Sequence, residues 1–339
     1  CDAATDLMSP PGEDEVLDDD VRPWELRGGE VGITVRDDFG FPVQPQLVVQ
    51  YLKSKQQRED SLPRTKLCWK KFLAADGEVR GGKVRNSKRI SRFILEDGVY
   101  PPIRRQVWSA LCKVDELREN SCSDYYHQLH EKYNEANPQI DKDIHRTFPN
   151  HTFFQSQFGA GALRRILNAY ATYNPQLGYC QSMNYIAGLL LIVLKDEELV
   201  FWIMVAIVNQ YLPDYFSRSL LGSLVDTKVF GIVLHDKFPK LSQHLQHVGY
   251  PLDVISTKWF MCLFAEAGIP TETLLWIWDS FFLVGADQLI YVALSAFRLL
   301  EKDLMKCQEP EDVRHILRDQ PMYFVDAQGL MKGCRTIRS

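Results

Sequence analysis

The 339-residue sequence lacks paired cysteines, a long hydrophobic run and an excess of basic residues, and each lack excludes a class of protein. None of its eight cysteines belongs to a CxxC pair, which argues against a zinc site or a redox disulfide of that kind. A chain of this length buries a large core without disulfide bonds. We therefore expect free thiols and a reducing, cytoplasmic environment.

The longest apolar runs are too short to cross a membrane. YIAGLLLIVL and LVFWIMVAIV have ten residues each, whereas a membrane-spanning helix needs about 20 apolar residues. Both runs are typical of buried core helices, and no signal peptide opens the chain. Because the sequence begins with Cys1, we expect a fragment boundary there. We predict a cytoplasmic protein without a transmembrane segment, or one recruited peripherally to endomembranes through its partners.

The charge is mildly acidic and unevenly distributed. A net charge of -5 argues against binding to nucleic acid, which needs a basic surface. Residues 1–20 contain eight Asp or Glu and no Lys or Arg, which is typical of a solvated acidic tail. Gly and Pro interrupt residues 21–45 every few positions. We expect an extended linker there, pinned by Trp24, Phe39 and Phe41.

Strand patterns are missing, and helical periodicity dominates from Pro45 onward. Helices are expected in segments bounded by Pro, Gly or Asn, at 45–60, 67–76, 88–97, 103–114, 123–136, 161–173, 180–194, 199–208, 241–248, 271–284 and 287–306. The fold class is therefore predicted to be all-α. Its expected parts are a tail and linker at 1–45, a helical lead-in with a polar loop at 46–88, one large multi-helical domain at 89–325 and a C-terminal tail at 326–339.

Familiar catalytic motifs are incomplete. GEVRGGKV, at Gly77–Val84, fits the glycines and lysine of a phosphate-binding loop, but the residue after that lysine is Val84 rather than the Ser or Thr that holds magnesium. Two histidine pairs at i, i+3 spacing lack further metal ligands, and no G-x-S-x-G motif is present. Cys180 has no neighbour that would lower the pKa of its thiol. The sequence therefore predicts no cofactor or metal site of its own.

One polar stretch, IDKDIHRTFPN, places an arginine near the end of a short helix. Asp143 and Arg146 are three residues apart, so they share a helix face and can pair. Pro149 stops the helix and favours an extended Phe148. Two interpretations remain open at this point. The pair is either an ordinary surface ion pair worth a few tenths of a kcal/mol, or a carboxylate holding an arginine that reaches an anion outside the domain.

A second stretch, YNPQLGYCQSMNYIAGLLLIVL, begins an apolar helix with polar residues. Asn174-Pro175 and Gly178 break the chain, so the helix is expected to begin near Tyr179 or Cys180. On such a helix Gln181, Asn184 and Gly188 share one side. The amides either satisfy nearby loop carbonyls or meet a partner or a buried network.

Together these stretches resemble the TBC domain, the family of helical GTPase-activating proteins for Rab small GTPases. Ile140, Asp143 and Arg146 fit that family's I-x-x-D-x-x-R arginine-finger motif, and Tyr179 to Gln181 fit its Y-x-Q glutamine-finger motif. Ser182 replaces the glycine of the commonest family form, GYCQGMN. Further matching positions are Arg104 and Trp108 upstream, and Trp259, Pro270, Trp278 and Asp279 downstream.

The resemblance implies a mechanism in which both fingers act on another protein. Arg146 would neutralise charge near the γ-phosphate, and Gln181 would orient the attacking water. Asp143 would hold the arginine and Tyr179 would shape the backbone of the glutamine. Asn184 and Ile140 would support them. The partner, a Rab in its GTP form, would carry GTP and Mg²⁺, so the chain needs no cofactor and regulates membrane trafficking without turnover of its own.

The remaining motif positions are interpreted as structural. Arg104 and Trp108 lie on an amphipathic helix where they would pack and hydrogen-bond, and Trp259, Trp276 and Trp278 lie in apolar runs typical of a core. The motif residue Asp279 is interpreted as structural with them. Two other functions stay open: a scaffold that binds GTP-loaded Rab without accelerating hydrolysis, and a helical interaction protein whose motifs are coincidental. Two complete fingers favour the activator, because binding alone needs neither.

Overall fold

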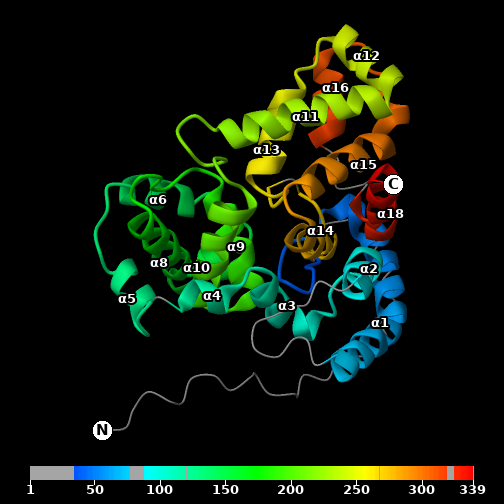
Figure 1. The fold of residues 1–339 in the computed structure, drawn as a ribbon. Coiled ribbons are helices and arrows are strands. Elements are labelled where there is room, and N and C mark those ends of the chain that lie inside the picture. Colours follow the sequence, from blue (N-terminus) through cyan, green and yellow to red (C-terminus); the bar gives the residue numbers. More distant parts are fainter. Residues whose placement is uncertain (1–33, 77–87, 120, 267, 319–323, 339) are drawn as a thin grey trace. The chain divides into compact units, whose positions relative to one another are not determined.

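The computed structural model describes residues 34–76, 88–119, 121–266, 268–318 and 324–338, which fold almost entirely into helices (Figure 1). The chain divides into two units, Cys1–Thr34 and Val35–Ser339, and the helices belong to the second. Within the described residues the extended structure is an isolated antiparallel bridge between Arg36 and Pro42, without a strand. The predicted all-α fold is therefore confirmed. The predicted acidic tail, Trp24 and the Gly77–Val84 loop lie outside the described residues.

One group of helices packs around α8 and α10 (green in Figure 1). Its members are α3 (Arg104–Leu111), α4 (Val114–Arg118), α5 (Tyr125–His130), α6 (Asn137–Ile144), α7 (Thr152–Gln155), α8 (Gln157–Tyr173), α9 (Met183–Leu194) and α10 (Glu197–Ala206). A π-helical turn, η3 (Ile207–Tyr211), continues α10. Helices α9 and α10 are the predicted buried apolar runs, and nearly all their side chains are buried.

A second group packs around α15 (yellow to red in Figure 1). It contains α11 (Leu221–Lys237), α12 (Pro239–Val248), α13 (Leu252–Met261), α14 (Thr271–Val284), α15 (Asp287–Leu304), α16 (Pro310–Arg318) and α18 (Ala327–Arg338). Helices α1 (Val48–Asp76) and α2 (Lys88–Asp97), with the short 3₁₀ turns η1 (Pro45–Leu47) and η2 (Pro101–Ile103), complete the unit. Helix α14 contacts α2, α3 and α15, so it joins the two groups.

Helix ends follow the expected stop signals in most places. Helix α8 ends at Tyr173, before Asn174-Pro175. Helix α12 ends on Gly249, whose φ of 75° is one that glycine adopts without strain. Helix α14 follows Pro270 and ends before Gly285.

Two proline signals act differently from the prediction. The helix expected at 123–136 ends at His130, and Asn137-Pro138 begins α6 instead of ending a helix. Proline is tolerated in the first turn of a helix because its missing N–H has no intrahelical partner there. The helices expected at 45–60 and 67–76 form the single helix α1 around Pro63. Pro63 is exposed, so water can reach the carbonyl that lacks its usual partner.

The predicted C-terminal tail at 326–339 is wrong, because residues Ala327–Arg338 form α18 on the surface of α15. Leu330 and Met331 are fully buried. Gly333 lets the two backbones approach closely, since a Cβ at this position would lie 2.1 Å from Ser295 Oγ. The terminal helix is part of the core.

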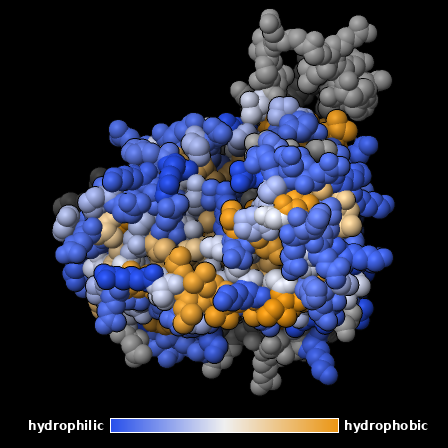
Figure 2. Space-filling model, turned by 90° about the horizontal axis from the view of Figure 1, so that it is seen from above, coloured by the Kyte–Doolittle hydropathy of each residue, from blue (hydrophilic) through white to orange (hydrophobic). Residues whose placement is uncertain are grey.

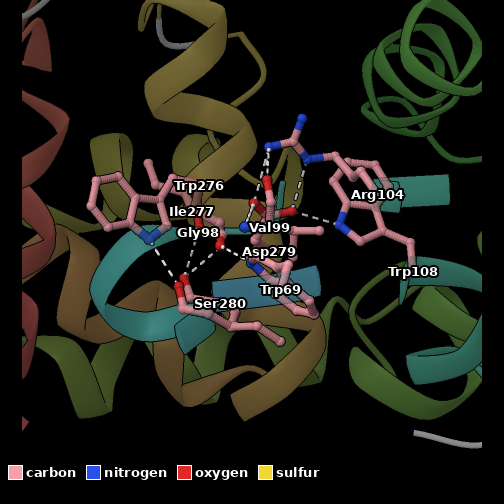
Figure 3. Close-up of polar contacts among 10 residues, drawn as sticks. Trp69, Gly98, Val99, Arg104, Trp108, Trp276, Ile277, Asp279 and Ser280 are labelled. Carbon is pink, nitrogen blue, oxygen red and sulfur yellow. Dashed lines mark hydrogen bonds and ion pairs between the residues drawn. The ribbon is translucent and has the colours of Figure 1, made fainter. Parts of the chain in front are cut away.

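A buried aspartate joins α14 to the chain around α3 (Figure 3). Asp279 accepts hydrogen bonds from Arg104 Nε (3.0 Å), Trp108 Nε1 (2.7 Å) and the Val99 amide (2.9 Å). Arg104 also donates to the Val99 carbonyl. A buried carboxylate is tolerated only when its oxygens accept hydrogen bonds and its charge is paired, as they are here. These contacts fit the structural interpretation of Arg104, Trp108 and Asp279.

Two of the three predicted core tryptophans are buried as expected, whereas Trp276 is only partly buried and donates from Nε1 to the Ile94 carbonyl (3.0 Å). Trp259 and Trp278 are 2% and 0% exposed, and Trp278 donates to the Leu263 carbonyl. The face shown in Figure 2 is largely hydrophilic, with several apolar patches. Helix α11 contributes exposed apolar side chains on one side, at Leu221, Leu224, Val225, Val229 and Ile232.

Candidate functional site

Arg146 lies in the turn directly after α6 and extends into solvent. Its Nη2 lies 2.7 Å from Asp143 Oδ1, so the predicted ion pair is present. The side chain of Arg146 is 46% exposed, whereas that of Asp143 is 1% exposed. The hydrogen bond to Asp143 raises the pKa of Arg146, which keeps the guanidinium charged. A buried carboxylate thus holds an exposed cation.

The residues after Arg146 form a tight loop against α9. Phe148 has a φ of 45°, so the predicted extended conformation is wrong. The His151 amide donates to the Phe148 carbonyl (2.9 Å), which closes the turn. The Phe148 ring packs edge-on against Tyr185 with centroids 5.5 Å apart. Packing of the ring and closure of the turn override the local preference of a residue before proline.

Gln181 lies on a turn before α9 rather than on the helix. The expected start near Tyr179 or Cys180 is wrong, because α9 begins at Met183. Ser182, the residue directly before α9, has a φ of 95° and a ψ of -30°, which is not a helical conformation, so the helix cannot begin earlier. Gln181 is exposed, and its side chain makes no hydrogen bond to any residue that the structure describes. Its amide is therefore available to a partner.

A buried hydrogen-bond network connects the Arg146 turn to the Gln181 turn. Tyr179 donates to Asp143 Oδ2 (2.6 Å), and the same hydroxyl lies 3.2 Å from Asn184 Oδ1. The Asn184 side chain donates to Thr147 Oγ1 (2.8 Å) and accepts from the Ser182 amide (3.1 Å). Asn184 thus belongs to a buried network, which is one of the alternatives left open above, whereas Gln181 is exposed outside this network.

The electrostatics of this network favour the protonated forms of Tyr179 and Cys180. Burial and then the hydrogen bond to Asp143 raise the pKa of Tyr179, so the phenol remains a donor. Burial, with the charge of Asp143, also raises the pKa of Cys180. The prediction that nothing lowers the pKa of this thiol is therefore confirmed.

Helix α9 lies unusually close to the loop after Arg146. A Cβ at Gly188 would lie 3.1 Å from Phe148 Cε2 and 3.2 Å from Thr147 Cγ2. Gly188 therefore lets the loop lie directly against α9. Ile140, the other predicted supporting residue, is fully buried on α6.

Sequence patterns missed three residues around the pair. Thr147 links Asn184 to the Asp143 carbonyl, to which its hydroxyl donates (2.7 Å). Gln139 donates to Asp143 Oδ1 (3.2 Å), and Tyr185 donates to the Arg146 carbonyl (3.3 Å). Gln139 is one helical turn before Asp143, which is a usable signal. The partnership of Tyr185 crosses 39 residues and leaves no local pattern.

A cavity of about 320 Å³ opens beside Arg146. Its walls come from the N-terminal segment, the 146–151 loop, α9 and the segment before α14, and include Phe41, Tyr185, Leu189, Glu266 and Ile269. The structural motif residues Arg104, Trp108 and Asp279 do not line it. The hydrogen bonds of the predicted motif residues therefore form two separate networks, one around Asp143 and one around Asp279.

Two further surveys cover only the described part of the chain. No three or more His, Cys, Asp or Glu side chains there are grouped so as to hold a metal ion. Nor does any helix among those residues combine the length and apolar character needed to span a bilayer.

Comparison with known proteins gives consistent matches. The family model described as the Rab-GTPase-TBC domain matches residues 101–305. Growth hormone-regulated TBC protein 1-A of Danio rerio is 33% identical over 287 residues, covering 83% of this chain and 76% of the relative. The Homo sapiens growth hormone-regulated TBC protein 1 is 31% identical, over 75% of this chain and 74% of its own length.

Solved structures agree with these matches. The Chlamydomonas flagellar RabGAP TBC domain superposes with a TM-score of 0.78 at 26% identity, covering 88% of this chain and 98% of that domain. The Ypt/Rab-GAP domain of Gyp1p has a TM-score of 0.67 at 16% identity, over 81% and 97% of the two chains. The second likeness supports the fold alone.

Proposed function

Because the chain belongs to the Rab-GTPase-TBC domain family, we propose that it accelerates GTP hydrolysis by a Rab small GTPase, with Arg146 and Gln181 supplied in trans. One observation carries the proposal. A single buried network holds the turns of both residues, while both side chains are exposed. Such an arrangement suits groups that act outside their own chain.

Arg146 supplies positive charge to the γ-phosphate of the bound nucleotide. Charge accumulates on the transferring phosphoryl group, and catalysis of this reaction is mainly positioning and electrostatic stabilisation. An arginine supplied in trans accelerates hydrolysis by roughly 10³ to 10⁵. Asp143 is buried and already paired with Arg146, so the guanidinium has few conformations before binding. The arginine therefore loses less conformational entropy when the partner binds.

Gln181 orients the attacking water. Its side-chain amide has a donor and an acceptor, which are the groups needed to position a water molecule against phosphorus. The Ser182 turn projects it from the end of α9, and Tyr179 ties this turn to Asp143. The two fingers therefore enter the partner with a fixed relative placement.

The partner completes the site. GTP and Mg²⁺ belong to the GTP-loaded Rab, and the chain itself turns over no substrate independently. Activity of this kind ends the active state of a Rab on its membrane and so regulates trafficking. Recruitment to that membrane occurs through partners.

GTP hydrolysis by a panel of purified Rabs tests the proposal. We expect acceleration on one or a few Rabs, a loss of about 10³-fold or more for Arg146→Ala, and a strong reduction for Gln181→Ala. Arg164→Ala is the matched control, because Arg164 is similarly exposed (43%) and also pairs with an aspartate of α6, Asp141. Binding of GTP-loaded Rab without acceleration by the wild type would replace the activator with the scaffold.

A further inference from the structure

The segment Val35–Val43, before α1, forms a tight turn that the family match at 101–305 does not include. The Val43 amide donates to the Val35 carbonyl (2.8 Å), and the Asp37 amide donates to the Phe41 carbonyl (2.9 Å). Asp37 Oδ1 accepts from the amides of Phe39 (3.0 Å) and Phe41 (2.8 Å). We call this segment the N-terminal turn. Phe39 and Phe41 pack against the core as predicted, but the described part of the predicted linker folds as a turn and is not extended.

Polar contacts fasten the N-terminal turn to the loop that follows Arg146. Arg36 Nη1 donates to the carbonyls of Gly40 (2.7 Å) and Asn150 (3.1 Å). His151 Nε2 lies 2.8 Å from the Phe39 carbonyl. Because His151 Nδ1 accepts from a backbone amide in α7, Nε2 carries the hydrogen and donates it to Phe39. Two hydrogen bonds from side chains to backbone carbonyls therefore join segments more than 100 residues apart in sequence.

Aromatic packing continues the same contact. The Phe41 ring meets Phe148 edge-on, with centroids 5.0 Å apart, and lies 4.6 Å from the His151 ring. Gly40 has a φ of 91°, and a Cβ there would lie 2.9 Å from His151 Nε2. The close approach of the turn to His151 thus needs glycine at this position.

The loop after Arg146 is consequently held from two sides. On one side α9 supports Thr147 and Phe148 through the close approach at Gly188. On the other side Phe41 of the N-terminal turn packs on Phe148 and His151, and all three residues line the 320 Å³ cavity. Without the turn, Phe148 would lose one of its aromatic packing partners and would be more exposed to this space.

We propose that the N-terminal turn is a positioning element for Arg146, which acts through Phe148 and His151. This inference rests on the proposed function. The turn makes no hydrogen bond or ion pair with Arg146 among the described residues. Its effect is to restrict the loop that carries the arginine, and so to keep the guanidinium where a partner's phosphate can meet it. A misplacement of about 1 Å can lower a rate by about 100-fold.

Two variants of the full chain separate the turn from general stability. Phe41→Ala removes the aromatic contact, and Arg36→Ala removes the bond to Asn150 without touching a buried side chain. We expect kcat for Rab GTP hydrolysis to fall about 10-fold to 100-fold in Phe41→Ala and less in Arg36→Ala, with little change in the affinity for GTP-loaded Rab. Phe41→Tyr should restore kcat.

Lys55→Ala is the matched control. It removes the ion pair (2.5 Å) between Lys55 on α1 and Asp38 on the N-terminal turn. Among the described residues, neither of the two makes a hydrogen bond, ion pair or ring contact with Phe148 or His151. Its kcat should stay within about twofold of wild type. If kcat fell as much in Lys55→Ala as in Phe41→Ala, any destabilisation of the N-terminal turn would lower the rate, whether or not Phe148 and His151 are contacted. That result would overturn the proposal.

A double-mutant cycle distinguishes the two proposals. If the turn acts through the arginine, Phe41→Ala lowers the rate strongly in the wild-type background and hardly at all in the Arg146→Ala background. Equal losses in both backgrounds would overturn the positioning role. If Arg146→Ala itself had no effect, the proposed function would fail first. If it abolished activity while Phe41→Ala left kcat unchanged, only the present inference would fail.

Discussion

Ser182, beside the candidate glutamine finger, has a φ of 95° that side chains rarely adopt. A left-handed conformation costs a non-glycine residue about 1–2 kcal/mol. The Asn184 side chain accepts a hydrogen bond from the Ser182 amide (3.1 Å) and so holds the backbone in this conformation. The backbone of this turn is therefore maintained by its surroundings, as is common near functional groups.

The strain at Ser182 is testable by comparing Gly with Ala. Both changes remove the hydroxyl, and only Ala keeps a Cβ at positive φ. We expect Ser182→Gly to have a free energy of unfolding about 1 kcal/mol above that of Ser182→Ala, measured in urea. The difference between wild type and Ser182→Ala then reports the contribution of the Ser182 hydroxyl. Equal stabilities of the Gly and Ala variants would show that the turn is unstrained.

Asp143 gives a second test at the scale of single residues. Asp143→Asn keeps the shape but removes the charge that pairs with Arg146 and accepts from Tyr179. We expect kcat for Rab GTP hydrolysis to fall about 10-fold to 100-fold, because the guanidinium is no longer confined. Tyr179→Phe leaves the ion pair intact and should lower the free energy of unfolding by about 1 kcal/mol with a smaller effect on kcat. A larger loss of kcat in Tyr179→Phe would reverse these roles.

The residue types of the candidate site are readable from sequence, whereas most of its partnerships are not. The spacing of Asp143 and Arg146 predicts their contact, because it follows from helix geometry. The bond from Tyr179 to Asp143 crosses 36 residues. Such a contact depends on how α6 and α9 pack, which no local pattern encodes.

At the scale of elements, Gly188 sets the distance between α9 and the Arg146 loop. Gly188→Ala adds a Cβ that would lie 3.1 Å from the Phe148 ring and must push the loop outward. The substitution also adds helix propensity, about 1 kcal/mol. We expect an almost unchanged melting temperature together with a reduced kcat for Rab GTP hydrolysis. An unchanged kcat would mean that the loop absorbs the shift without moving Arg146.

Helix α18 gives an element-scale test of the terminal segment. Gly333→Ala should lower the free energy of unfolding by about 1–3 kcal/mol, because the new Cβ meets Ser295 and disrupts its hydrogen bond to the Leu330 carbonyl. Gly231→Ala is the matched control, since no atom lies within 4 Å of a Cβ at this position on α11. It should stabilise the protein by about 0.5–1 kcal/mol. Equal effects of the two changes would mean that α18 packs loosely.

The boundaries of elements show where sequence patterns fail. Helix α8 ends just before Asn174-Pro175, whereas α6 begins with Asn137-Pro138. The same dipeptide is found in both places because proline cannot continue a helix but is tolerated in its first turn. The strong periodicity of α9, α10 and α14 predicts their existence correctly, since burial of a continuous apolar surface decides it. Helix α18 was missed because glycine and basic residues obscure its buried side, which becomes apparent only beside α15.

At the scale of the whole molecule, an all-α fold follows from composition and periodicity, but the arrangement that places the fingers does not. The Asp143 network joins α6 to α9, and the Asp279 network joins α14 to α3 across more than 170 residues. The N-terminal turn adds a third connection, from Phe39 to His151. Three long-range contacts therefore connect the elements around the candidate site, and none of them follows from the spacing of residues along the chain.

The pH dependence of stability is also a property of the whole unit. Burial raises the pKa of Asp37, Asp226 and Glu272 above their usual values of 3.8, 3.8 and 4.5. The folded state therefore binds protons more tightly than the unfolded state at these groups. Their contribution to the free energy of unfolding is greatest below the unfolded pKa values, and it decreases as pH rises from about 4 through the raised folded values.

Asp226 isolates one of these groups, because it lies on α11, away from the candidate fingers. Asp226→Asn keeps an oxygen that can accept from the Tyr215 hydroxyl but removes the charge that burial and Asp287 disfavour. Relative to wild type, the variant should therefore gain stability as pH rises from 4 to 7, when measured by urea unfolding at fixed ionic strength. If the difference in free energy of unfolding between the variant and wild type stayed constant with pH, Asp226 would have the same pKa in the folded and unfolded states. If the variant instead lost stability relative to wild type as pH rises, the fold would favour the ionised carboxylate, because the hydrogen bond from Tyr215 would outweigh burial.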